Sequence, residues 1–192
     1  MKHWFWRFAL KAMGWKTDGR LPAGIKKAVI ISAPHTSSWD FVIGWMTFRV
    51  ADINIRFLIK AEAFKGFMGW FLTKLGGIPV TRGKKNNMVD QLKIMFDTSE
   101  SLYVVITPEG TRKLVTQWKK GFYLIALEAG VPIACSFINY GNKTGGIGPI
   151  ITPSGDYEKD MDMTKFRQNN DIVWNEGIKE MHLVLCHSFI DG

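Results

Sequence analysis

Hydrophobic positions along the 192-residue chain follow two alternating patterns. Short apolar runs rich in β-branched residues are typical of buried strands, and longer segments with apolar residues three and four positions apart are typical of helices. Runs of the first kind occupy residues 28–33, 54–61, 78–81, 102–107, 132–140 and 182–190. Segments of the second kind occupy residues 39–51, 62–75, 88–98, 119–129 and 157–169.

This alternation predicts an α/β fold with a single-domain sheet, largely parallel or mixed, and helices on both faces. No internal repeat, linker or low-complexity segment divides the sequence, so residues 1–192 are expected to form one domain. Residues 145–155 are rich in Gly and Pro, which predicts a loop with at most one short strand.

The N-terminal residues predict a separate amphipathic helix over residues 1–16. His3, Arg7 and Lys11 form one narrow polar stripe, and most other positions are apolar or aromatic. A helix of about 18 Å can lie in a membrane interface but cannot cross a hydrocarbon core of roughly 30 Å. The side chains expected at this interface are Trp4, Trp6, Arg7, Phe8, Lys11 and Trp15. The alternative is a helix that packs on the protein's own core.

Charge is distributed unevenly along the chain, whose formal net charge is +8. Residues 1–125 carry 20 Lys and Arg against 8 Asp and Glu, a net +12, whereas residues 126–192 carry 5 against 9, a net −4. Such a basic region indicates an anionic partner, either a membrane surface or a nucleic acid. Eight Trp residues favour the membrane, because their rings settle at the level of lipid headgroups.

Two further features narrow the class of protein. No stretch reaches the roughly 18–20 apolar residues of a transmembrane helix, and Lys11 interrupts the only candidate core of a secretory signal. Cys135 and Cys186 both lie in apolar runs, where reduced core thiols are expected rather than a disulfide framework. We therefore expect a peripheral protein on the cytoplasmic side of a membrane.

Candidate chemistry lies in three loops that follow predicted strands. In the first, Ser37 or Ser38 can cap the next helix, which places Asp40 in its first turn and lets it approach His35. A carboxylate on one imidazole nitrogen leaves the other nitrogen free to act as a base. The pair alone is a weak signal, because roughly 0.2 such pairs are expected by chance in this composition.

The other two loops, residues 107–112 and 76–82, each combine glycine with an arginine. Two arginines on separate loops could clamp one phosphate, although each loop by itself could equally be a solvated turn. The sequence has no G-x-S-x-G elbow, no zinc spacing, no Walker sequence and no G-x-G-x-x-G. A base without a protein nucleophile suggests direct attack by a hydroxyl group of a substrate.

Taken in order, these loops resemble the glycerolipid acyltransferase family, which includes the lysophosphatidic acid acyltransferases. That family has an H-x-S-x-x-D box, a G-x-I-x-x-x-R block, a P-E-G-T-R block and a V-P-I block. The similar segments here are residues 35–40, 76–82, 108–112 and 131–133. One such block would carry little information, whereas four blocks in this order are specific.

The resemblance implies an enzyme of phospholipid biosynthesis. It would transfer a fatty acyl group to the hydroxyl of a lysophospholipid or glycerol phosphate, as a 1-acylglycerol-3-phosphate O-acyltransferase does. The donor would be an acyl-CoA or acyl carrier protein thioester, with no metal and no tightly bound cofactor. By the same resemblance His35 is the general base and Asp40 orients it. The acceptor site would be lined by Ser37, Ile78, Arg82, Glu109, Gly110, Thr111 and Arg112. The pocket wall would be supported by Val131, Pro132 and Ile133.

Two alternatives to this interpretation stay open. A non-catalytic module could use the same fold to bind a membrane or a lipid. A nucleic-acid-binding protein would fit the basic region, but no RNP or helix-turn-helix pattern accompanies it, so no nucleic-acid partner is expected.

Overall fold

A computed structural model describes residues 2–33, 38–80, 85–110 and 118–161 of the chain. Its strands are β1 (Lys16–Asp18), β2 (Lys27–Ser32), β3 (Ile55–Lys60), β4 (Gly77–Val80), β5 (Leu102–Ile106), β6 (Ile133–Asn139) and β7 (Thr144–Ile151). Its helices are α1 (Lys2–Ala12), α2 (Ser38–Val50), the short 3-10 helix η1 (Ala61–Ala63), α3 (Gly66–Leu75), α4 (Lys85–Thr98), α5 (Gly121–Glu128) and α6 (Tyr157–Asp160).

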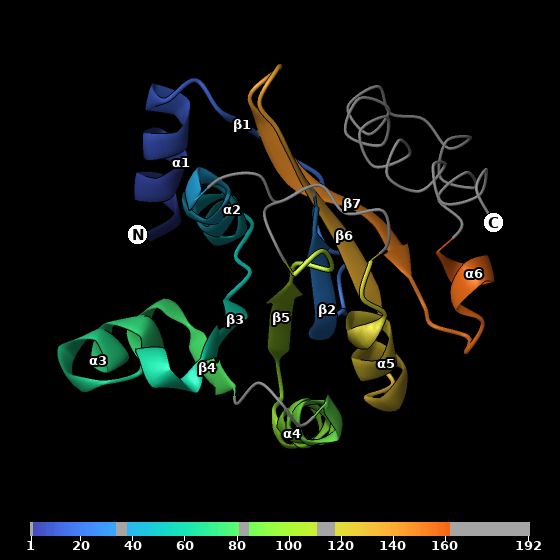
Figure 1. Ribbon diagram of the computed structural model, residues 1–192. Helices are drawn as coiled ribbons and strands as arrows, with labels where there is room; N and C mark the ends of the chain where they lie inside the picture. Colours follow the sequence, from blue (N-terminus) through green and yellow to red (C-terminus); the bar gives the residue numbers. More distant parts are fainter. Residues whose placement is uncertain (1, 34–37, 81–84, 111–117, 162–192) are drawn as a thin grey trace, which may run out of the picture.

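In the described part of the chain, the strands form one seven-stranded sheet in the order β1-β7-β6-β2-β5-β3-β4 (Figure 1). The five strands from β6 to β4 are mutually parallel, β7 pairs antiparallel with β6, and β1 pairs parallel with β7. The expected α/β class with a largely parallel, mixed sheet is therefore confirmed. The strand predicted over residues 182–190 lies outside the described residues.

Helices cover both faces of the sheet, as the sequence predicts. Successive residues of the central strand β2 point to opposite faces because a strand has a period of two. Val29 and Ile31 belong to a cluster that includes side chains of α4 and α5. Ile30 belongs to a second cluster that includes Phe48 of α2. Strand β2 therefore contributes side chains to the cores on both faces of the sheet. Each fully buried aliphatic side chain stabilises the fold by about 1.5–3 kcal/mol.

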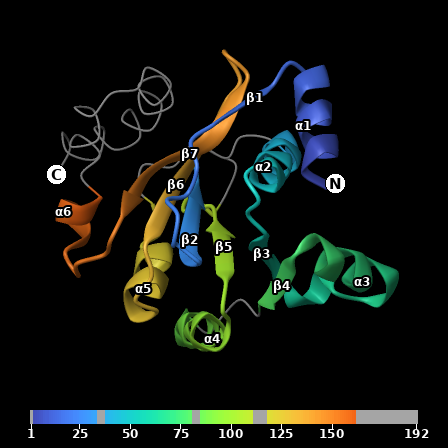
Figure 2. The same ribbon diagram turned by 180° about the vertical axis from the view of Figure 1, so that it is seen from behind.

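The N-terminal helix α1 packs against α2, as both ribbon views show (Figure 2). Leu10 of α1 is 2% exposed and shares a cluster with Ile43 and Met46 of α2. A hydrogen bond of 2.8 Å between Nδ1 of His3 and the carbonyl oxygen of Arg49 ties the start of α1 to the end of α2. One face of α1 is therefore part of the core.

The prediction for residues 145–155 is wrong in part, because β7 is an eight-residue strand rather than a loop. Its glycines hide the strand pattern from the sequence, yet one of them is required by the packing. A Cβ on Gly146 would overlap the backbone carbonyl of Asp18 in the neighbouring β1. Glycine therefore permits a close approach between β7 and β1, a strand that the sequence pattern did not predict.

Candidate active site

The predicted functional loops all leave the sheet at one edge. Parallel strands end on the same side, and ligands of open α/β sheets bind beyond the carboxyl ends of the strands. Ile31 of β2 pairs with Ile106 of β5, so these two central strands end at the same height. Lys60 and Val80 pair at the ends of β3 and β4. The segments that follow β2, β5 and β4 therefore start from this shared edge.

Asp40 is held in the first turn of α2, directly after the loop that follows β2. Its side chain is buried, with 5% exposed. The hydroxyl of Tyr140 donates a hydrogen bond of 2.5 Å to Oδ1 of Asp40. His35 and Ser37 lie outside the described residues.

Tyr140 is the site residue that sequence reasoning missed. It follows the last residue of β6, and its ring packs edge-on against Trp15 with centroids 5.3 Å apart. One hundred residues separate Tyr140 from Asp40, and only the parallel pairing of β6 with β2 brings the two ends together. The available signal was a tyrosine at the end of a predicted strand, residues 132–140, at the same edge as the other loops.

A tight turn follows β5 at residues 107–110. The amide of Gly110 donates to the carbonyl of Thr107 at 3.1 Å, and the amide of Lys119 donates to the carbonyl of Pro108 at 3.0 Å. Gly110 has a φ of 64°, and a Cβ there would lie 2.6 Å from Nζ of Lys119. Glycine thus lets an ammonium group lie close to the turn.

Thr111 and Arg112, which complete this block in the sequence, lie outside the described residues, and so does Arg82. The cation that the structure does place beside the turn is that of Lys119, which the sequence analysis did not single out. The feature of the sequence that could have indicated Lys119 is the pair of lysines directly before the apolar segment of α5. A positive charge at this position favours an anionic ligand such as a phosphate.

The structure places Ile78 in the core. Its side chain is 5% exposed and belongs to the core cluster that includes Val80 and Leu92. Ile78 and Val80 are two residues apart in β4, so both point to the same face, under α4. Ile78 therefore supports the sheet beneath the site, and its contact with an acceptor stays a prediction.

Residues 131–133 lie away from Asp40, and their support of a pocket wall stays a prediction. Val131 and Ile133 are buried, but they lie at the start of β6, whereas Asp40 lies near the ends of the parallel strands. The carbonyl of Pro132 accepts a hydrogen bond of 3.0 Å from the amide of Val29, near the start of β2. A strand of seven residues spans roughly 20 Å. This segment supports the opposite edge of the sheet, because the direction of β6 places it there.

The aromatic residues of the N-terminal segment divide between surface and core. Trp4 is 74% exposed and Phe8 is 61% exposed, whereas Trp6 is half-buried against Trp45, with ring centroids 4.8 Å apart. Trp15 is 7% exposed and packs in the core, unlike the exposed rings of Trp4 and Phe8. Arg7 and Lys11 are exposed, as the expected interface requires.

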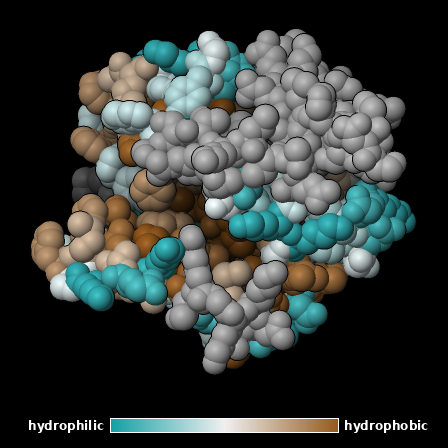
Figure 3. Space-filling view, in the orientation of Figure 1, coloured by the Kyte–Doolittle hydropathy of each residue, from teal (hydrophilic) through white to brown (hydrophobic). Residues whose placement is uncertain are grey.

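The surface that carries these exposed rings continues beyond α1. Apolar residues gather along the side of the molecule on which α1 and α3 lie (Figure 3). Among the described residues, no helix has both the length and the apolar character that a bilayer crossing requires.

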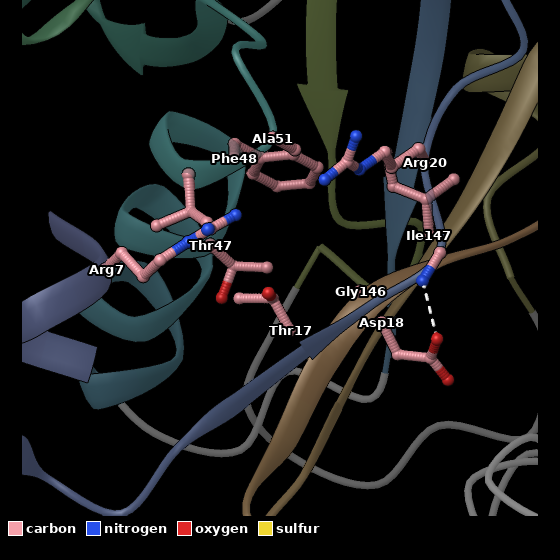
Figure 4. A pocket seen from close by; sticks show the side chains of 11 residues that line it. Arg7, Thr17, Asp18, Arg20, Thr47, Phe48, Ala51, Gly146 and Ile147 are labelled. Carbon is pink, nitrogen blue, oxygen red and sulfur yellow. Dashed lines mark hydrogen bonds between the residues drawn. The ribbon is translucent and has the colours of Figure 1, made fainter. Parts of the chain in front are cut away.

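A polar recess of about 340 Å³ is lined by residues of α1, α2, β1 and β7. The side chains of Arg7 and Arg20 extend into it from opposite sides (Figure 4). Neither Asp40 nor the turn at residues 107–110 lines this recess, so it is distinct from the candidate active site. Arg7 therefore lies at the boundary between the exposed face of α1 and this recess.

Comparison with known proteins agrees with the fold and identifies the family. The chain is similar to the crystal structure of the 1-acyl-sn-glycerophosphate (LPA) acyltransferase PlsC from Thermotoga maritima, with a TM-score of 0.57 and 18% sequence identity. The similarity covers 94% of this chain and 78% of that one, and at this identity it concerns the fold. No curated protein matches the chain significantly. The model of the acyltransferase family matches residues 16–138, more than half of the sequence. The chain therefore belongs to the acyltransferase family.

Proposed function

We propose that this protein transfers a fatty acyl group from a thioester donor to the hydroxyl of a lysophospholipid or glycerol phosphate. The observation that carries the proposal is the buried Asp40, held by the Tyr140 hydroxyl, five residues after His35 in a family-like H-x4-D box. The comparison structure, described as an LPA acyltransferase, supports an acceptor of the 1-acylglycerol-3-phosphate type. The donor in this proposal is acyl-CoA or an acyl carrier protein.

The chemistry needs one base and one leaving group. His35 takes the proton of the acceptor hydroxyl while its oxygen attacks the thioester carbonyl carbon, and Asp40 stabilises the imidazolium that forms. The tetrahedral intermediate then collapses: the new carbon–oxygen bond remains, the carbon–sulfur bond breaks, and the imidazolium returns the proton to the thiolate. The products are the ester and a free thiol. Each step uses side chains of this chain and needs no metal.

The acceptor's phosphate would bind on the side of the turn at residues 107–110. Arg82 and Arg112, by resemblance, supply bidentate donors for it. The ammonium of Lys119 beside Gly110 adds a positive charge from a described residue. A phosphate held there would present its neighbouring hydroxyl group to the imidazole of His35.

The partner in this proposal is an anionic membrane surface, with the protein bound peripherally on the cytoplasmic side. The exposed rings of Trp4 and Phe8 on α1, next to Arg7 and Lys11, support it. Aromatic rings settle at the headgroup boundary while neighbouring cations face phosphate groups. The acceptor lipid would then reach the site from the bilayer.

The central test replaces the base. His35→Ala should lower thiol release from acyl-CoA, measured in the presence of lysophosphatidic acid, by about 10²–10⁴-fold, because general-base catalysis contributes on that order. Vesicle binding and the thermal midpoint should stay at wild-type values, and mass spectrometry should identify the diacyl product of the wild type. Turnover near that of the wild type in His35→Ala would overturn the mechanism. A wild-type protein that binds lipid and releases no thiol would instead be a non-catalytic lipid-binding module.

A further inference from the structure

The helix α3 exposes more apolar surface than a water-facing helix can explain. Phe67 is 77% exposed, Trp70 57%, Met68 54% and Phe71 44%. Gly69 is the residue of α3 that is buried. Soluble proteins rarely leave contiguous apolar side chains of this size in water, and such patches mark an interaction site.

The core of the protein does not account for these side chains. The backbone of Gly69 lies against that of Phe64, and the helix ends at Gly76, which adopts a left-handed conformation. Gly69 thus provides the close backbone contact of α3 and Gly76 ends the helix, while the large side chains of α3 project outward. Phe67 and Trp70 already stack on each other, with ring centroids 5.5 Å apart. This leaves a preformed aromatic surface that is available to a partner.

Charges around α3 indicate what that partner is. Lys65 is the N-cap residue and Lys74 lies in the last turn, and the sequence of α3 contains no acidic residue. A cation at a helix N-terminus is unfavourable for the helix itself, so Lys65 is not explained by helix stability. The ammonium of Lys74 lies 5.9 Å from the ring centroid of Trp70.

Apolar rings between flanking cations match an anionic bilayer. The rings enter the headgroup and acyl boundary, and the lysines extend to the phosphates. A second copy of the chain would bring Lys65 and Lys74 close to their own equivalents, and like charges repel. The lipid surface is therefore the occupant that suits both the apolar and the charged side chains.

The position of α3 agrees with this assignment. In both ribbon views α1 and α3 lie on the same side of the molecule, at the left in Figure 1 and at the right in Figure 2, and α2 lies beside α1 (Figures 1 and 2). The first turns of α2 expose Trp39 and Phe41, immediately around Asp40. Exposed rings are thus present on all three helices, and those of α2 are directly next to Asp40 in the sequence.

We propose that α3 is a second membrane-docking element, which lies in the headgroup region of an anionic bilayer together with α1. Two separated points of attachment define an orientation, whereas α1 alone would leave the molecule free to rotate about one helix. In the docked orientation the edge with Asp40 faces the lipid. That the docked orientation brings the active site to its lipid acceptor rests on the proposed function, whereas the docking of α3 does not depend on it.

The test measures co-sedimentation with vesicles of equal parts phosphatidylcholine and phosphatidylglycerol. The double variant Phe67→Ser/Trp70→Ser should bind roughly tenfold more weakly than the wild type, because it loses two buried aromatic contacts. The matched control is Ile94→Ser on α4, a side chain 61% exposed on another part of the surface, which should bind like the wild type. Thermal midpoints should be equal for all three proteins.

A second variant tests the charges independently. Lys65→Gln/Lys74→Gln should weaken binding to the anionic vesicles several-fold and leave the weaker binding to pure phosphatidylcholine vesicles unchanged. Wild-type binding by the serine double variant would overturn the proposal. A wild-type dimer in sedimentation equilibrium that the serine variant abolishes, with vesicle binding unchanged, would overturn it in favour of a second copy of the chain.

The catalytic proposal is tested apart from docking. With a short-chain lysophosphatidic acid that stays monomeric in water, the serine double variant should release thiol from acyl-CoA at the wild-type rate. If neither protein releases thiol, the proposed function fails while the vesicle result stands. If both turn over and both bind vesicles equally, docking through α3 fails while the proposed function stands.

Discussion

Asp40 is positioned by contacts that come from three separate parts of the chain. Its backbone belongs to the first turn of α2, and its Oδ1 accepts a hydrogen bond from the hydroxyl of Tyr140. The ring of Tyr140 in turn packs edge-on against Trp15. Trp15 in turn shares a core cluster with Leu10 of α1. A buried carboxylate needs such partners, because burying a charge without a hydrogen bond is costly.

Removing the hydroxyl of Tyr140 should therefore affect turnover rather than binding. Tyr140→Phe keeps the ring contact with Trp15 but loses the hydrogen bond to Asp40. We expect kcat to fall roughly tenfold, with the KM of either substrate within about twofold of the wild type, since hydrogen bonds to charged groups contribute about 1.5–3 kcal/mol. Steady-state kinetics with both substrates varied measures this split.

The matched control for that variant is Tyr103→Phe. The hydroxyl of Tyr103 also donates a hydrogen bond of 2.8 Å, but to the carbonyl of Ile25 at the start of the strands. A similar loss of kcat in Tyr103→Phe would show that removal of any such hydroxyl loosens the fold, which would contradict a positioning role for Tyr140.

Among the elements, α5 and α6 are joined by a hydrogen-bond network centred on Asp160. The carboxylate accepts bonds from the Tyr123 hydroxyl, at 2.6 Å, and from the amide and hydroxyl of Ser154, at 2.6 and 2.8 Å. The Ser154 amide and then the Tyr123 hydroxyl hold the pKa of Asp160 below its usual value. These hydrogen bonds connect the segment after β7 to α5.

This network makes one contribution to stability dependent on pH. A carboxyl whose pKa is lower in the folded state stabilises the fold above its unfolded pKa, and the contribution is lost as pH falls through the folded pKa. Asp160→Asn should therefore lower the thermal midpoint at pH 7. The difference in thermal midpoint between Asp160→Asn and the wild type should shrink as the pH falls below about 3.9, the ordinary pKa of an Asp side chain.

Thermal unfolding across this pH range measures the effect of Asp160→Asn. Glu158→Gln is the comparison, because Glu158 forms an exposed ion pair with Lys120, 2.9 Å apart, and such pairs contribute little. A midpoint difference for Asp160→Asn that stays constant with pH would mean that the carboxylate charge is not what fastens α6.

At the scale of the whole molecule, α1 has two functions that occupy opposite faces. Leu10 is buried against α2, while Trp4 and Phe8 project into solvent. Helices α1 and α3 lie on one side of the molecule, and α2, whose first turn carries Asp40, lies beside α1 (Figure 1). Helix α1 therefore contributes to folding through one face and, in our proposal, to membrane binding through the other.

These two functions should separate in point variants. Leu10→Ala should lower the free energy of unfolding by about 2–5 kcal/mol, because it leaves a cavity in the core. Trp4→Ser/Phe8→Ser should change it by no more than about 0.5 kcal/mol but weaken vesicle binding. Denaturant unfolding and co-sedimentation measure the two effects. Vesicle binding that is unchanged in Trp4→Ser/Phe8→Ser would leave α1 a core helix only.

The sequence by itself determined those features that depend on neighbouring residues. Alternating apolar runs located β2, β5 and most helices within a few residues, because burial imposes a period of 2 on strands and 3.6 on helices. The motif order identified the family that the matching model confirms. The placement of Asp40 in the first turn of α2 was also predictable, since helix capping is local.

Only the tertiary structure decided which of these residues share a site. The direction of β6 brought Tyr140 to Asp40 and carried Val131 to the opposite edge. Burial against α4 removed Ile78 from the surface, and packing on α2 removed Trp15. Strand β7 formed where glycines had indicated a loop. In each case the decisive contact joins residues far apart in the chain, and local hydrophobic patterns carry no information about such partners.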